Sequence, residues 1–339
     1  MSAPLLEVDD LHVEFDTYGG TVHAVRGVGF EVASGETLAI VGESGCGKSV
    51  TVQSIMGLIP MPPGRITRGR ALLRGQDILR NKLADGVDIR GSQVGMIFQD
   101  PMTSLNPTMT IGDQIAETLV VHRGMNAADA AERAVELLTA TRIPEAARRA
   151  QQYPFEFSGG MLQRSMIAMA IACEPAILIA DEPTTALDVT IQSQILDLMK
   201  DLQRQTGMAI VLITHDLGVV ARMADRVNVM YAGEIVERGS AEDVFYRSAH
   251  PYTLGLRDAM PARDAERGKR LRPIDGSPPD LFSPPVGCGY FARCPYAMRT
   301  CERAHPPQFE TGSGHGSRCW LHHPDAPHRA ERIHYGARP

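Results

Sequence analysis

The chain lacks a segment that is long and apolar enough to cross a membrane as a helix. Such a helix needs about 20 predominantly apolar residues, and no run of 18 occurs among the 339 residues. The chain also lacks an excess of basic residues, because 34 Lys and Arg are outnumbered by 40 Asp and Glu, for a formal net charge of −6. We therefore predict a chain that does not itself span a membrane and is not a general nucleic-acid binder, which would carry a basic surface.

Two further features are missing. No internal repeat is visible, so we expect a single copy of each motif described below. Nothing at the N-terminus has the form of a signal peptide, so we expect a reducing compartment in which disulfides do not persist. The chain is 43% hydrophobic, which is enough for a sizeable core, and its length suits one domain with an extension.

The clearest motif is a phosphate-binding loop, Gly42–Ser49, with the pattern G-x-x-x-x-G-K-S. Leu38–Val41 before it is a predicted buried strand, and Ser49–Leu58 after it is a predicted helix. Glycines allow a tight turn whose N–H groups point at phosphate, and the helix N-terminus adds partial positive charge. Lys48 can reach the β- and γ-phosphates, and Ser49 can bind Mg²⁺ through its hydroxyl. The residues expected to contact the nucleotide here are Gly42, Ser44, Gly45, Cys46, Gly47, Lys48, Ser49 and Val50.

Polar side chains follow three other predicted strands. Asp181 ends the apolar strand 177–180, and Glu182 is next to it. A carboxylate there can hold Mg²⁺ through its water shell, and its neighbour can act as general base toward water. His215 follows strand 210–214, and Gln99 follows strand 94–98. Ligands of open α/β sheets bind at such strand ends.

A second candidate anion site precedes Asp181 in the chain. Ser158 is a good N-cap, and Gly159–Gly160 leave open N–H groups at the start of a helix predicted to run to about Ala172. An ordinary capped helix would explain Ser–Gly–Gly, but not its place just before the Asp181 strand.

Taken together, these motifs closely resemble those of ABC-transporter nucleotide-binding subunits, and within them the ATP-binding subunits of bacterial dipeptide/oligopeptide importers. The resemblance covers nearly the whole chain. It implies a Walker A loop at Gly42–Ser49, a signature at Ser158–Met161 and a D-loop at 186–188. Met161 departs from the general ABC signature, which has Gln, and is typical of the peptide-importer branch.

The resemblance also implies the roles of single residues. Glu182, His215 and Gln99 would be catalytic, as base, switch histidine and Q-loop residue. Ser49, Gln99 and Asp181 would bind Mg²⁺. Ser158, Gly159 and Gly160 would contact the γ-phosphate of ATP held by a second ATPase subunit, which makes the active form a dimer.

An aromatic residue near the N-terminus stacks on adenine in this family. Tyr18, within the turn-rich stretch 15–20, is our choice for that contact. Phe15 is the alternative, and a plain surface tyrosine in a hairpin turn is the other reading of Tyr18.

The tail carries four of the six cysteines, Cys288, Cys294, Cys301 and Cys319, spaced C-x5-C-x6-C-x17-C. Clustered thiols in a reducing compartment suggest a metal site. Zinc sites usually contain a C-x2–4-C knuckle, which is absent, whereas a [4Fe–4S] cluster needs one thiolate for each iron. We predict such a cluster, as the resemblance also implies, with zinc and free thiols as alternatives. Its expected role is structural, with redox sensing as the alternative, and we expect it to leave the nucleotide affinity of the core nearly unchanged.

The predicted fold class is α/β: a RecA-like P-loop ABC ATPase core with a helical subdomain and a small cysteine-rich extension. The predicted ATPase domain spans 1–258, its helical subdomain about 100–165, and the extension 259–339. Asn126 is a plausible cap for a helix over 127–139, and Gly207 can end a helix that begins at Val189.

The expected function is that of a motor, in which ATP and Mg²⁺ drive import of dipeptides or oligopeptides. The implied partners are a second ATPase subunit, expected to be a paralogue, two transmembrane permease subunits and, indirectly, an extracytoplasmic peptide-binding protein. The implied localisation of the protein is peripheral, on the cytoplasmic face of the inner or plasma membrane. The alternative is a soluble ABC ATPase with an iron–sulfur cluster that acts on nucleic acid or ribosomes, although such chains resemble tandem ATPases with N-terminal cysteines.

Overall fold

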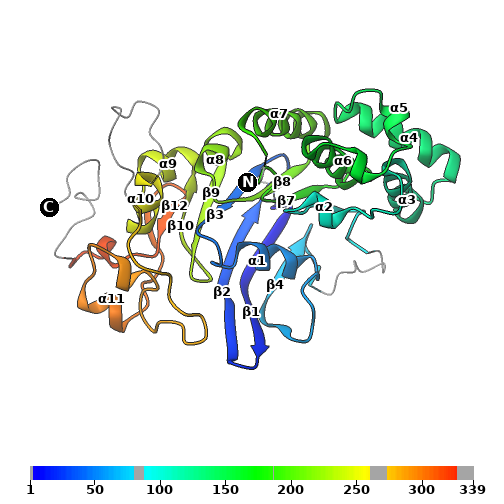
Figure 1. Ribbon diagram of the computed structural model, residues 1–339. Coiled ribbons are helices and arrows are strands. Elements are labelled where there is room, and N and C mark those ends of the chain that lie inside the picture. Colours follow the sequence, from blue (N-terminus) through cyan, green and yellow to red (C-terminus); the bar gives the residue numbers. More distant parts are fainter. Residues whose placement is uncertain (1–2, 80–87, 186, 260–272, 327–339) are drawn as a thin grey trace. The chain divides into compact units, whose positions relative to one another are not determined.

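The computed structural model describes residues 3–79, 88–185, 187–259 and 273–326 (Figure 1). Chain contacts divide it into two compact units. The described residues of Met1–Leu6, Val32–Thr37 and Leu72–Ile213 form the first unit, and those of Glu7–Glu31, Leu38–Ala71 and Thr214–Pro339 form the second. Among the described residues, no helix is long and apolar enough to cross a membrane.

The first unit is built on three parallel strands, β6 (Val94–Ile97), β7 (Ile177–Asp181) and β8 (Ala209–Thr214). Val94 lies opposite Ile177, and Ile177 lies opposite Ala209. Every residue of β7 and β8 is buried, which explains why both read as unbroken apolar runs in the sequence. A short strand, β5 (Gln76–Asp77), pairs with the last two residues of β4 (Gly64–Leu73).

Helices make up most of the remainder of this unit (Figure 1). They are α2 (Pro101–Ser104), α3 (Ile111–Arg123), α4 (Ala127–Ala140), α5 (Ala146–Arg149), the 3-10 turn η1 (Pro154–Glu156), α6 (Gly159–Ile171) and α7 (Val189–Thr206). The expected caps are confirmed. The Asn126 side chain accepts a 3.0 Å bond from the Asp129 N–H, and Gly207 ends α7 in the left-handed region at φ 70°. Cys173 follows α6 by two residues and is fully buried.

The second unit contains an antiparallel sheet and a mixed sheet. In the first, β1 (Leu6–Thr17) lies between β2 (Gly20–Val32) and β4, and β1 and β2 form the long hairpin drawn in blue in Figure 1. In the second, β3 (Thr37–Val41) pairs in parallel with β9 (Arg226–Tyr231), and β9 pairs antiparallel with β10 (Glu234–Ser240).

Helix α1 (Lys48–Ile55) follows β3 and ends three residues before the predicted Leu58, because Gly57 turns into the left-handed region at φ 60°. The other helices of this unit are α8 (Leu217–Met223), α9 (Ala241–Tyr246), α10 (Pro251–Asp258), α11 (Arg299–Arg303), and the 3-10 turns η2 (Phe291–Arg293) and η3 (Trp320–His322).

The cysteine-rich tail extends the mixed sheet of the second unit. Strand β12 (His315–Ser317) pairs with β10, where Glu237 lies opposite Ser317, and β11 (Phe309–Gly312) pairs with β12. In the same unit, Tyr231 of β9, Tyr252 of α10 and Tyr290 of the tail pack in one hydrophobic cluster. The tail therefore shares the core of its unit.

Candidate nucleotide site

The phosphate loop has the backbone that its glycines predict. Gly45 and Gly47 have φ angles of 79° and 101°, in the region that favours glycine. A Cβ on Gly47 would lie 2.4 Å from the Ala24 carbonyl oxygen, so a side chain does not fit there. At Gly45 nothing lies within 4 Å of that position, and the residue is exposed. The loop is thus closed on one side and open to solvent on the other.

Lys48 is folded into this loop. It is the first residue of α1, it is buried, and its ammonium group donates hydrogen bonds to the carbonyl oxygens of Gly42 at 2.9 Å and Glu43 at 3.0 Å. Its charge therefore lies at the centre of the turn. Ser44 is exposed, while Ser49 and Val50 are half-buried at the start of α1. Burial raises the pKa of the Cys46 thiol, which keeps it protonated and weakly nucleophilic.

In the first unit, two predicted catalytic residues are in contact. The Gln99 side-chain amide donates a 3.1 Å hydrogen bond to a carboxylate oxygen of Glu182. The same oxygen accepts a 2.9 Å bond from the Thr185 hydroxyl. Adjacent parallel strands bring them together, because Gln99 follows β6 and Glu182 follows β7. Asp181 is buried as the last residue of β7.

Glu182 has an unusual backbone. Its φ is 49°, in the left-handed region, and its N–H donates a 2.9 Å bond to the Ile213 carbonyl oxygen. A non-glycine residue rarely adopts this conformation, which is found disproportionately at functional sites.

The signature segment is also in the first unit. Ser158 is the N-cap of α6, and its hydroxyl accepts a 3.4 Å bond from the Met161 N–H. Ser158 and Gly159 are exposed, so the first N–H groups of this 13-residue helix are open to solvent. A Cβ on Gly160 would lie 2.9 Å from the Ile191 methyl group of α7, which accounts for glycine there. Ala186 of the predicted D-loop lies outside the described residues.

Two other predicted residues belong to the second unit. His215 is exposed and directly follows β8, ahead of Asp216, the N-cap of α8. Tyr18 is fully exposed at the tip of the β1–β2 hairpin. Phe15, the alternative for adenine stacking, is half-buried on β1, where its ring lies 3.0 Å from the position of a Cβ on Gly64.

Sequence reasoning missed two residues that hold the phosphate loop from outside. The Tyr252 hydroxyl accepts a 2.8 Å hydrogen bond from the Glu43 N–H. Arg293, in the tail, donates to both carboxylate oxygens of Glu43, at 2.6 and 3.0 Å. The tail therefore contacts the nucleotide loop, and the expectation that the cluster leaves nucleotide affinity nearly unchanged stays a prediction. No sequence signal connects positions 43 and 293, which are 250 residues apart.

The four tail cysteines line one small enclosed cavity, together with His250 and aromatic side chains. Burial raises the pKa of Cys288 to about 11 and that of Cys294 to about 12, and it also raises the pKa of Cys319. Within the described ranges, no group of three or more His, Cys, Asp or Glu side chains is arranged to hold a single metal ion. Neither the predicted iron–sulfur cluster nor the zinc alternative therefore has support from a metal-ligand group in this part of the chain.

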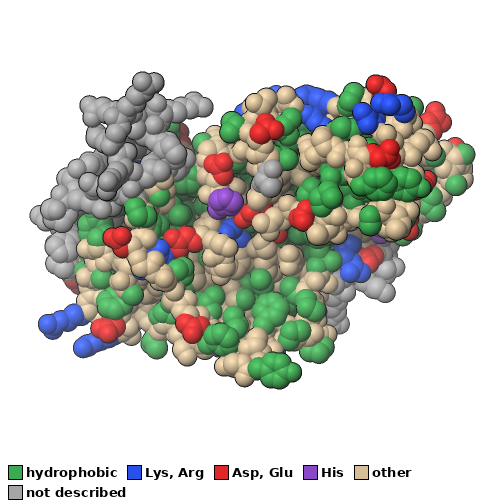
Figure 2. Space-filling model, in the orientation of Figure 1, with side chains coloured by type: hydrophobic (Ala, Val, Ile, Leu, Met, Phe, Trp, Pro, Cys, Tyr) green, Lys and Arg blue, Asp and Glu red, His purple; other side chains and the backbone are tan. Residues whose placement is uncertain are grey.

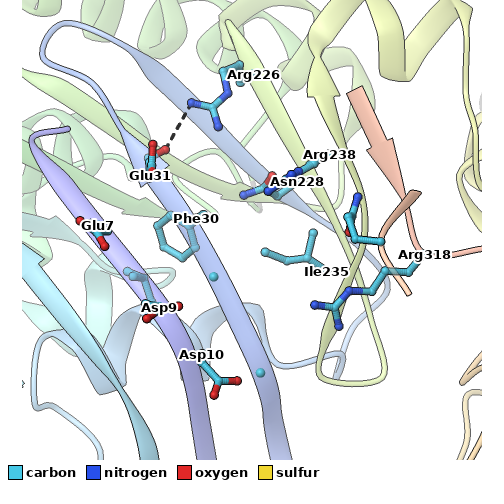
Figure 3. Close-up of a pocket in the computed structure, with 14 residues that line it drawn as sticks. Glu7, Asp9, Asp10, Phe30, Glu31, Arg226, Asn228, Ile235, Arg238 and Arg318 are labelled. Atoms are coloured by element: carbon cyan, nitrogen blue, oxygen red, sulfur yellow. Dashed lines mark hydrogen bonds between the residues drawn. The ribbon is translucent and has the colours of Figure 1, made fainter. Parts of the chain in front are cut away.

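A larger groove in the second unit has walls of opposite charge (Figure 3). Glu7, Asp9 and Asp10 line one side of it, and Arg238 and Arg318 lie toward the other. The carboxylates of the acidic wall would repel a triphosphate, so this groove is not the nucleotide site.

Comparison with known proteins places these features in a family. A family model for ABC transporters matches residues 25–185, and one for the C-terminal region of oligopeptide/dipeptide transporters matches 236–301. The chain is 55% identical to the dipeptide transport ATP-binding protein DppD of Bacillus subtilis over 324 residues, or 96% of each chain. It is 52% identical to the oligopeptide transport ATP-binding protein OppD of Salmonella typhimurium over 302 residues, or 89% of each chain. The chain belongs to the family of ATP-binding subunits of dipeptide and oligopeptide ABC transporters.

The fold agrees with this membership. The chain is similar to the ATP-binding cassette MJ0796, solved as a dimer in a post-hydrolysis state bound to ADP and Pi, with a TM-score of 0.62 and 28% identity over 70% of this chain and 98% of that one. It is also similar to cbiO1 of Clostridium perfringens, part of the complex cbiONQ, with a TM-score of 0.59 over 72% of this chain and 91% of that one. The predicted α/β P-loop fold and ABC ATPase activity are confirmed. The names of these relatives mention no iron–sulfur cluster.

Proposed function

We propose that this ABC ATPase is the motor subunit of an importer for dipeptides or oligopeptides. The observation that carries the proposal is the similarity to the transport proteins DppD and OppD over nearly the full length, including the C-terminal region. A generic ABC ATPase would share only the cassette. The peptide itself would be selected by an extracytoplasmic binding protein and the membrane subunits.

The phosphate loop suits ATP by its chemistry. It offers backbone N–H groups at open glycines, a lysine ammonium inside the turn and a helix N-terminus. We assign phosphate contacts to Gly42, Ser44, Gly45, Cys46, Gly47, Lys48, Ser49 and Val50. Magnesium, which prefers oxygen ligands, would neutralise phosphate charge when bound, and we assign its contacts to Ser49, Gln99 and Asp181. Tyr18 remains our choice for adenine stacking, with Phe15 as the alternative.

Hydrolysis needs a base that accepts a proton from water. Glu182 supplies the carboxylate, and bonds from Gln99 and Thr185 hold one of its oxygens in place. Because Gln99 contacts Glu182, it would respond to changes at the reacting water and to movements of the segment that follows Gln99. His215, exposed at the end of β8, would contact the γ-phosphate.

The signature explains why the working unit would be a pair of subunits. Ser158 and Gly159 are exposed at the start of α6, and the N–H groups of Ser158, Gly159 and Gly160 would form a second anion site in addition to the phosphate loop. We propose that they contact ATP bound to the Walker A loop of a second ATPase subunit, a paralogue of this one. The dimeric state of MJ0796 supports this arrangement.

An exposed apolar surface of the first unit suits the membrane subunits. Val120 and Val121 of α3 are exposed, as are Met102 of α2 and Phe155 of η1. Figure 2 shows hydrophobic side chains gathered over this helical region near α3. Exposed apolar patches of this kind mark interaction surfaces. We propose that two permease subunits dock here and that the protein lies peripherally on the cytoplasmic face of the inner or plasma membrane.

We also propose that Cys288, Cys294, Cys301 and Cys319 bind a [4Fe–4S] cluster. All four line one cavity, and each thiolate of a cluster binds a different iron, so the sulfurs need not approach one another as closely as around one ion. Because burial keeps these thiols protonated, binding must release protons.

Two experiments test these proposals. Purification of the tagged protein from membranes, followed by mass spectrometry of the intact complex, should yield a second ATPase and two permease subunits. Recovery with ribosomes or DNA instead would favour the nucleic-acid alternative.

For the tail, anaerobic purification should give about four irons per chain and a broad absorption near ~400 nm. Stoichiometric zinc without iron would overturn the cluster.

A further inference from the structure

One partly buried ion pair joins the tail to the phosphate loop. The two terminal nitrogens of Arg293 donate to the two carboxylate oxygens of Glu43, at 2.6 and 3.0 Å. This two-bond geometry is the strongest form of arginine–carboxylate contact. The Arg293 side chain is only 5% exposed and that of Glu43 26%, so solvent screens the pair much less than a surface pair.

The tail and the core hold the Arg293 guanidinium in a fixed position. Its Nε donates to the Asp275 carbonyl oxygen at 2.9 Å, and one terminal nitrogen donates to the Tyr231 hydroxyl at 3.2 Å. It also lies over the rings of Tyr231 and Tyr290, 5.8 and 6.0 Å from their centroids. These contacts leave the side chain little freedom, so the position of Arg293 determines that of the Glu43 carboxylate.

Glu43 in turn belongs to the loop that holds Lys48. It is the second residue of the loop, and its carbonyl oxygen accepts a bond from the Lys48 ammonium at 3.0 Å. A bare carboxylate at this place would repel the triphosphate that the loop is built to bind. Arg293 supplies the compensating charge through its two hydrogen bonds to the Glu43 carboxylate.

The backbone around Arg293 is part of the cysteine module, by which we mean residues 288–301. Arg293 directly precedes Cys294 and closes the turn η2, in which the Phe291 N–H donates to the Cys288 carbonyl oxygen at 3.0 Å. The Cys288 N–H donates to the Cys301 carbonyl oxygen at 2.7 Å. The place of Arg293 therefore depends on how the cysteines are arranged.

We propose that Arg293 is a positioning residue through which the cysteine module controls the affinity of the phosphate loop for ATP. An ordered module holds the guanidinium against Glu43, neutralises its charge and fixes the loop. A disordered module releases Glu43, whose charge then opposes nucleotide binding. The control of ATP affinity rests on the proposed binding of ATP to this loop, and its dependence on metal rests on the proposed cluster.

The test measures the dissociation constant for Mg–ATP by equilibrium titration of the full-length protein. Arg293→Ala should raise it about tenfold, equivalent to about 1.4 kcal/mol. The double variant Arg293→Ala with Glu43→Gln should recover most of that loss, because it removes the uncompensated charge. A purely structural role would make the double variant as weak as the single one or weaker. High salt should also bring the dissociation constant of Arg293→Ala closer to that of the unchanged protein, because salt screens the uncompensated charge of Glu43.

Arg238→Ala is the matched control. Arg238 makes a 2.9 Å ion pair with Glu310 that also joins core and tail, but it is exposed and does not touch the loop. The Arg238→Ala variant should bind ATP with the same affinity as the unchanged protein. Amide hydrogen exchange adds a readout that does not depend on affinity: peptides covering 42–49 should exchange faster in Arg293→Ala and not in the control.

Cys294→Ser tests the link to the module, with iron measured in the same samples. It should raise the dissociation constant as much as Arg293→Ala, and combining the two should add nothing. Unchanged affinity and exchange in folded Arg293→Ala, or no recovery in the double variant, would overturn the proposal. Absence of iron from the unchanged protein would refute only the proposed cluster. The comparison of the Arg293 variants with the unchanged protein does not depend on what the cysteines bind.

Discussion

Replacing Tyr252 by Phe removes a single hydrogen bond to the phosphate loop and almost nothing else. The Tyr252 hydroxyl accepts a 2.8 Å bond from the Glu43 N–H. The residue is 0% exposed, and its ring packs against those of Tyr231 and Tyr290, with centroids 4.5 and 5.4 Å away. Phe keeps the ring and leaves only the space of one oxygen atom, so we expect no substantial cavity cost.

The magnitude follows from the fate of the Glu43 N–H. A typical intramolecular hydrogen bond contributes about 1 kcal/mol, and a buried donor left without an acceptor costs about 1–3 kcal/mol. Glu43 is half-buried, so water can partly replace the lost acceptor. We expect a loss of about 1 kcal/mol in the stability of the loop, which corresponds to a roughly fivefold change in its opening equilibrium.

Amide hydrogen exchange measures this opening directly. The Glu43 amide should exchange roughly fivefold faster in Tyr252→Phe, while amides of β9 should be unchanged. Tyr246→Phe is the control, because Tyr246 is exposed and its hydroxyl makes no hydrogen bond among the described residues. Equal exchange of the Glu43 amide in Tyr252→Phe and the unchanged protein would show that the hydroxyl does not hold the loop, and the reasoning would fail.

Three further predictions concern the nucleotide site. Glu182→Gln should retain ATP binding but lose roughly 10²–10⁴-fold in single-turnover hydrolysis, because the base is removed; near-normal hydrolysis would contradict its role. Lys48→Ala should weaken binding at its own Walker A, whereas Ser158→Arg, mixed with a normal partner, should weaken binding at the partner's site; an effect of Ser158→Arg confined to its own Walker A would refute the shared site. Gly47→Ala should abolish ATP binding, since it combines a left-handed backbone, costing about 1–2 kcal/mol, with a Cβ 2.4 Å from the Ala24 oxygen; titration showing normal affinity would contradict the loop geometry.

Local features of the chain were predictable because their causes are local. The loop 42–49 follows from its glycines and lysine, and helix α7 was predicted at its observed bounds because Gly207 ends the run. The boundary of α1 was missed by three residues, since the turn at Gly57 carries no signal that distinguishes it from a glycine inside a helix.

The candidate site was predictable as a set of residues, but not as a set of contacts. Gln99 and Glu182 each follow an apolar strand in the sequence, which suggests that both lie at the same edge of a parallel sheet. That β6 and β7 are neighbours, and that the two side chains are 3.1 Å apart, appears only in the structure. Strand order depends on packing between segments far apart in the chain, and the sequence pattern does not encode it.

By itself, the sequence determined that this protein binds and hydrolyses nucleotide, because phosphate binding needs a contiguous loop whose residues can be read in order. It also placed four cysteines together in the tail. Only the tertiary structure decided that the tail continues the sheet through β12 and β10 and that Arg293 reaches Glu43 across 250 residues. An arginine that pairs with a distant carboxylate has no local pattern. Its partner is selected by the packing of Tyr231, Tyr252 and Tyr290, which brings the cysteine module to the phosphate loop.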